Sequence, residues 1–131
     1  MTGLDTNVLA RYFAKDDPVQ SPIASRVMLA LTTEEPGWVS TTTILELVWF
    51  LAAKGRVPRD GLIRILRTLL AAEEIVLEEP ELIDGALRGY QKGNADFADY
   101  VIAFSGRAAG CARTLTFDQR AARDAGMELI R

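Results

Sequence analysis

The sequence predicts an α/β protein, a three-layer α/β/α arrangement with a short-stranded parallel sheet. Short apolar segments alternate with longer segments whose apolar residues follow helical spacing. Five short strands are predicted between helices, an order typical of a parallel sheet covered on both faces. Because no repeat, linker or low-complexity tract interrupts this order, we expect one domain over residues 1–131.

The first part of the chain begins with a very short strand that ends at Asp5. Ser21-Pro22 is typical of a helix N-cap followed by a first-turn proline. A later helix, from Thr41, is unusually apolar, and Gly55 ends it. The elements expected here are a strand over 1–4, helices over 8–13 and 21–31, a strand over 38–40, helices over 41–53 and 58–70, and a strand over 75–77.

The second part of the chain is organised around a helix that begins near Asp96. Asp96 and Asp99 are three residues apart, so their side chains share a face of this helix. The helix continues with small or aliphatic residues, as close packing requires. The other elements expected are a helix over 80–90, a strand over 114–117, a helix over 119–125 and a strand over 127–130.

The composition narrows the chemistry. The chain has no histidine and one cysteine, Cys111, which excludes catalytic imidazole, thiolate clusters and an internal disulfide. A single thiol fits a reducing cytoplasm, and the small neighbours of Cys111 predict that it is buried. No apolar run is long enough to span a membrane. What remains is carboxylate chemistry, with hard cations such as Mg²⁺ or Mn²⁺.

Acidic residues stand where strands end or helices begin: Asp5, Glu46, Asp96, Asp99 and Asp118. Each has an ordinary explanation as a helix cap, and the residues from Thr43 to Glu46 match a capping box. Taken together they favour another explanation, because helices that follow parallel strands begin at the same edge of the sheet. Carboxylates gathered there repel one another unless a cation neutralises them. The pattern therefore predicts a divalent metal site.

These motifs resemble the PIN domain family. The resemblance rests on the segments around Asp5-Thr6-Asn7, Glu46 within an apolar helix, Asp96 to Ala103, and Thr116-Phe117-Asp118, and it covers nearly the whole chain. The small size is similar to the VapC-type toxins of bacterial toxin–antitoxin pairs. The resemblance implies an endoribonuclease that depends on Mg²⁺ or Mn²⁺ and hydrolyses RNA phosphodiester bonds.

The resemblance also implies roles for individual residues. Asp5, Glu46 and Asp99 match the three core acids, and Asp118 matches a frequent fourth. Asp96 matches an acid present in many members, but is also expected to cap its helix. Residues expected to hydrogen-bond the ligating carboxylates or a phosphate are Thr6, Asn7 and Thr116, and candidates for holding the RNA backbone are Arg11, Arg107, Arg113 and Arg120.

The expected partners are RNA, a VapB-like antitoxin and a second copy of the chain. The antitoxin and the homodimer are inferred from the apolar helices over 41–53 and 58–70, whose Trp49, Phe50, Leu62 and Leu66 cannot all face one sheet. The alternative is that these two helices bury each other.

Other functional classes fit less well. A receiver domain would need paired acids after the first strand and a late lysine, and a haloacid-dehalogenase-type phosphatase would need an aspartate where Asn7 stands. A PIN-like binding module without activity stays open, although all four core acids are present.

Overall fold

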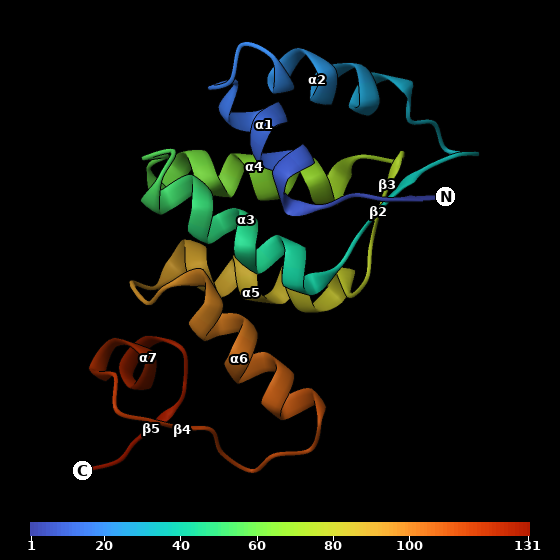
Figure 1. Cartoon of the computed structure of the whole chain (residues 1–131). Helices are drawn as coiled ribbons and strands as arrows, with labels where there is room; N and C mark the ends of the chain where they lie inside the picture. Colours follow the sequence, from blue (N-terminus) through green and yellow to red (C-terminus); the bar gives the residue numbers. More distant parts are fainter. The chain divides into compact units, whose positions relative to one another are not determined.

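The structure, a computed structural model, describes all residues 1–131 and contains seven helices and five short strands (Figure 1). It divides into two units, Met1–Pro80 and Glu81–Arg131, which are described in turn. The predicted α/β class with short parallel strands is confirmed. The strands pair as a three-stranded sheet in the first unit and a two-stranded sheet in the second. None of the helices combines the length and apolar character needed to cross a membrane.

The first unit is built on the parallel sheet β1-β2-β3, formed by Thr2–Gly3, Gly37–Val39 and Ile75–Leu77. Thr2 pairs with Gly37, and Gly37 pairs with Ile75. The chain leaves β1 just before Asp5 and leaves β2 just before Ser40, so two helices begin at the same edge of the sheet. This placement brings the start of one helix close to the first turns of the other.

The helices of the first unit are α1 (Thr6–Ala14), α2 (Gln20–Ala30), α3 (Thr41–Ala53) and α4 (Arg59–Ala71). In the upper part of Figure 1, α1 packs against α2 and α3, and α4 packs against α3. Buried apolar residues three or four positions apart on α3 and α4 help to form the core, as the helical spacing predicts. Its fully buried side chains include Leu9, Val39, Ile44, Leu47, Leu51 and Leu66.

The prediction that Ser21 caps α2 is wrong. The helix begins one residue earlier, at Gln20, and Ser21 is buried inside its first turn. The N-cap position is Val19, whose side chain accepts no hydrogen bond. Oδ1 of Asp17 instead accepts hydrogen bonds from the N–H groups of Val19 at 2.9 Å and Gln20 at 2.7 Å. An aspartate three residues ahead of the helix therefore provides the acceptor that was assigned to the serine.

The expectation of a broad exposed apolar surface on α3 and α4 is also wrong. Leu62 and Leu66 are only 3% and 1% exposed, because these two helices pack against each other and cover them. Phe50 is half-buried. Of the four side chains only Trp49 stays in solvent, at 64% exposure.

The second unit contains α5 (Pro80–Lys92), α6 (Phe97–Ala108) and α7 (Gln119–Asp124) with strands β4 (Leu115–Thr116) and β5 (Glu128–Leu129). An aromatic cluster joins α5 to α6, since the ring of Tyr90 meets Phe97 and Tyr100 edge to face at 5.7 and 6.4 Å between centroids. The predicted burial of Cys111 is wrong. It lies in the loop that follows α6, directly after the left-handed Gly110, and its side chain is exposed.

Candidate functional site

A pocket of about 530 Å³ in the first unit brings together four of the predicted residues. Asp5, Thr6 and Asn7 reach it from the start of α1, and Glu46 reaches it from α3. These residues lie close together because α1 follows β1 and α3 follows the neighbouring β2, so both helices begin at the same edge of the sheet. The pocket therefore joins residues that lie forty positions apart in the sequence.

Glu46 is not part of a capping box. The cap of α3 is Ser40, whose Oγ accepts a hydrogen bond from the N–H of Thr43 at 3.0 Å. Glu46 therefore lies beyond the first turn, where no free backbone N–H needs it. Its Oε1 instead accepts a hydrogen bond from the Thr6 hydroxyl at 3.1 Å. The capping explanation for this glutamate is excluded, and a threonine from another helix orients its carboxylate.

Asp5 does cap its helix, as the ordinary explanation predicted. It is the N-cap of α1, and its Oδ1 accepts a hydrogen bond from the N–H of Thr6 at 2.7 Å. A carboxylate has two oxygens and about four lone-pair positions, so capping leaves capacity for a second partner. Asp5 and Glu46 therefore both contact Thr6, one through its backbone and one through its hydroxyl.

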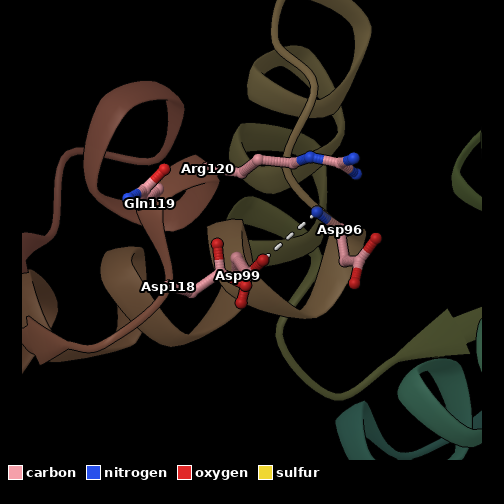
Figure 2. A pocket seen from close by; sticks show the side chains of 5 residues that line it. All are labelled: Asp96, Asp99, Asp118, Gln119 and Arg120. Carbon is pink, nitrogen blue, oxygen red and sulfur yellow. Dashed lines mark hydrogen bonds between the residues drawn. The ribbon is translucent and has the colours of Figure 1, made fainter.

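The second unit holds a separate acidic pocket (Figure 2), lined by Asp96, Asp99, Asp118, Gln119 and Arg120. Asp96 is the N-cap of α6, and its N–H donates to Oδ2 of Asp99 at 3.2 Å, drawn as the dashed line. Burial raises the pKa of the Asp99 carboxyl, and the negative charges of Asp96 and Asp118 raise it further, against the opposing effect of this hydrogen bond. A negative charge on Asp99 is therefore disfavoured in this pocket.

Asp118 caps α7, again in agreement with the ordinary explanation. Its Oδ1 accepts a hydrogen bond from the N–H of Ala121 at 3.0 Å. Its own N–H donates to the Thr116 hydroxyl at 3.0 Å, so Thr116 fixes the backbone of this turn. The Thr116 hydroxyl accepts this bond and keeps its own O–H to donate, so its predicted hydrogen bond to a carboxylate or a phosphate stays a prediction.

The donor chemistry of both pockets suits a hard divalent cation, because every acid offers oxygen and no nitrogen or sulfur ligand is present. Neither unit taken alone contains a group of three or more acidic, histidine or cysteine side chains close enough to hold a metal ion. The carboxylates whose oxygens suit such a cation are Asp5 and Glu46 in the first unit and Asp96, Asp99 and Asp118 in the second.

The four arginines predicted to hold RNA lie in different surroundings. Arg120 lines the acidic pocket of the second unit, and its side chain extends along that pocket in Figure 2. Arg11 pairs with Asp16 at 3.1 Å and lines a groove between α1 and α2 that shares Asn7 with the first pocket. Arg113 pairs with Glu128 at 2.9 Å. Arg107 contacts the Phe104 ring and the Ala125 carbonyl oxygen.

Both pockets include residues that the sequence reasoning missed. Gln119 lines the second pocket, and the first is also lined by Leu45, Trp49 and Phe50. The sequence does hold a signal for Trp49, because it follows Glu46 by three positions on one helix, which places both side chains on one face. The sequence analysis instead assigns Trp49 to an apolar surface that packs on a partner.

Comparison with known protein families identifies the class. The PIN domain family matches residues 4–126, which include every acid of both pockets. The chain belongs to the PIN domain family. PIN domains are generally nucleases, typically metal-dependent ones that use divalent cations, and membership suggests RNA binding. A search of the curated proteins found no match.

Proposed function

We propose that this PIN domain is an endoribonuclease that hydrolyses RNA phosphodiester bonds with Mg²⁺ or Mn²⁺. The observation that carries the proposal is the set of acids on the two pockets of a PIN domain. In that set, one glutamate is oriented by a threonine hydroxyl, and one half-buried aspartate, Asp99, lies between two other acids of its pocket and has a raised pKa. With no histidine in the chain, carboxylates are the groups left to support hydrolysis.

The residues that we propose as cation ligands are Asp5 and Glu46 in the first unit, and Asp99 and Asp118, with Asp96 as an additional ligand, in the second. A bound divalent cation would supply a water of lowered pKa and would stabilise negative charge on the phosphate. Thr6 holds the Glu46 carboxylate in one orientation through its hydroxyl. Such a hydrogen bond reduces the side-chain freedom that ligation would otherwise remove.

The remaining pocket residues would hold the substrate. Arg120 is the arginine that lines an acidic pocket, and a guanidinium can donate two parallel hydrogen bonds to a phosphate. The amides of Asn7 and Gln119 line the two pockets and offer further donors to phosphate oxygens. Arg11 and Arg113, engaged in ion pairs with Asp16 and Glu128, are weaker candidates for this role.

The proposal is tested by cutting of RNA with and without cation. The purified protein should cut single-stranded RNA with Mg²⁺ or Mn²⁺ and stop in excess EDTA. Glu46→Gln should lose cutting, whereas the control Asp60→Asn, on the first turn of α4, should not. Undiminished cutting in EDTA would overturn the mechanism. Cation binding without any cutting would instead favour a PIN-like binding module without activity.

We further propose that the protein is a cytoplasmic toxin with an antitoxin partner, and that it forms a homodimer. The surface that supports a partner lies on α2 and its N-cap residue, where Val19, Ile23 and Val27 are 68%, 47% and 38% exposed at intervals of four residues. A row at this spacing is typical of a helix face that docks on another protein. Ile23 and Val27 also line the groove that includes Arg11.

The partner proposal is tested by expression in a bacterial host. Induction should arrest growth, and a small protein from the native host should co-purify with the wild type. Ile23→Asp should release that protein, whereas Val76→Asp, an exposed position on β3, should retain it. Monomeric sedimentation at tens of micromolar, with no co-purifying protein, would contradict both the antitoxin partner and the homodimer that we propose.

A further inference from the structure

Trp49 is the feature of the first pocket that the metal chemistry leaves unexplained. It is 64% exposed, although an indole is a large apolar group and gains stability when it is covered. It lines the same pocket as Asp5, Thr6, Asn7 and Glu46. The pocket therefore combines two carboxylates and a hydroxyl group with an exposed aromatic ring.

The surroundings of Trp49 do not form a protein-binding face. Protein interfaces are marked by contiguous apolar patches. The candidates for such a patch on α3 and α4 are withdrawn from solvent, since Leu62 and Leu66 are buried and Leu45 and Phe50 are half-buried. A single exposed indole beside two carboxylates offers a flat ring for one flat ligand.

We propose that Trp49 stacks on an unpaired base of the RNA substrate and so positions the strand in the first pocket. The inference rests on the proposed ribonuclease function, because it assigns a role to the aromatic residue of a pocket whose acids would act on the phosphate. Single-stranded nucleic acid presents both groups together, a charged backbone and a base that is free to stack on an aromatic side chain.

Trp49 projects from a helix that is held in place at its start and along its buried face. Its helix is anchored by the Ser40 cap and by the buried Ile44, Leu47 and Leu51, so the side chain projects from a rigid element. Glu46 lies one turn earlier on the same face and is held by Thr6. A base on the indole would therefore lie at a set position relative to that carboxylate. Stacking accepts any base, so this contact selects unpaired strands and not a sequence.

The first test compares ligands that cannot be cut. The probes are AMP, which carries a base, and ribose phosphate, which lacks one, both titrated with Mg²⁺ present. AMP should quench tryptophan fluorescence in the wild type, and ribose phosphate should not. In Trp49→Phe only Trp38 remains, so the AMP-dependent quenching should disappear. Equal quenching by both probes, or quenching that persists in Trp49→Phe, would overturn the stacking.

The second test is the cleavage of a single-stranded RNA oligonucleotide. Loss of one base stack should raise KM of Trp49→Ala about 5- to 150-fold, with kcat within about twofold. Trp49→Phe should recover most of the affinity, because a phenyl ring also stacks. The control Leu29→Ala removes another strongly exposed apolar side chain, on α2, and should leave KM unchanged.

The outcomes separate this inference from the function on which it rests. A wild type that cuts no RNA with either cation overturns the proposed function, whatever Trp49 does. A wild type that cuts, with an unchanged KM in Trp49→Ala, overturns the stacking alone. A Trp49→Ala variant whose sedimentation changes while its KM does not would identify the indole as a protein contact, and would also overturn it.

Discussion

Replacing Asp99 by asparagine distinguishes a metal ligand from a helix-terminal acceptor. Asparagine has nearly the same volume, and its amide oxygen can still accept the hydrogen bond from the Asp96 N–H, which is 3.2 Å long. The substitution therefore removes a formal charge and leaves the shape of the turn. If Asp99 only supports the start of α6, the protein should keep its activity.

The structure allows the expected change in stability to be worked out. Removing the charge relieves repulsion from Asp96, about 0.2–0.5 kcal/mol for like charges one turn apart. It also loses the attraction of a carboxylate to the positive end of α6, about 0.3–1 kcal/mol. These terms oppose each other, so the free energy of unfolding without metal should change by less than about 1 kcal/mol, and Tm by at most about 4 °C.

The pH dependence has a definite sign. Burial raises the pKa of Asp99, so the folded state binds a proton more readily than the unfolded state does. The ionised carboxylate therefore costs stability above its folded pKa and costs none below the ordinary value of 3.8. The free energy of unfolding of Asp99→Asn relative to the wild type should thus increase as the pH rises from 3.8 through the folded pKa of Asp99.

Activity should respond far more strongly than stability. Loss of a residue that only orients a ligand typically costs about 10- to 100-fold in metal affinity or rate, so loss of a ligand should cost about 100-fold or more. Metal titration, RNA cutting and thermal melts with and without Mg²⁺ measure the three quantities. The control is Asp84→Asn, which removes an aspartate of the same unit that pairs with Arg88 on α5. An Asp99→Asn protein that binds metal and cuts RNA like the wild type would refute the assignment.

Two further predictions concern the scaffold. Gly89→Ala should lower Tm by several degrees, although alanine has the better helix propensity. The new Cβ would lie 2.6 Å from the buried Tyr100 ring, and overpacking costs about 1–3 kcal/mol. The control is Gly3→Ala, whose Cβ would have no heavy atom within 4 Å and which should melt like the wild type. Hydrogen bonds from the N–H groups of Gln20 and its neighbour lower the pKa of Asp17, so its contribution to stability is present at neutral pH and is lost as the pH falls through its folded pKa, below 3.8. Asp17→Ala should therefore have a lower Tm than the wild type at pH 7, and this difference in Tm should shrink in acid. A difference in Tm that does not depend on pH would contradict stabilisation of the helix start by the Asp17 carboxylate.

The sequence alone determined the α/β class and most of the helices. Periodic apolar residues and terminal glycines or prolines are local signals, so α3 and the strand β3 were predicted over the same residues that the structure gives them. The resemblance of the motifs to PIN domains also depended only on order and spacing, and the family match over residues 4–126 confirmed it. The toxin role, the metal ligands and the partners stay predictions.

Tertiary structure decided what the acids and the apolar residues contact. Thr43 to Glu46 reads locally as a capping box, but Ser40 begins the helix, and Thr6 from another helix reaches Glu46. Leu66 and Trp49 are both large and apolar on neighbouring helices, yet one is buried and the other is in solvent. Sequence spacing fixes which side chains share a face of a helix, whereas burial and long-range hydrogen bonds depend on which other element covers that face.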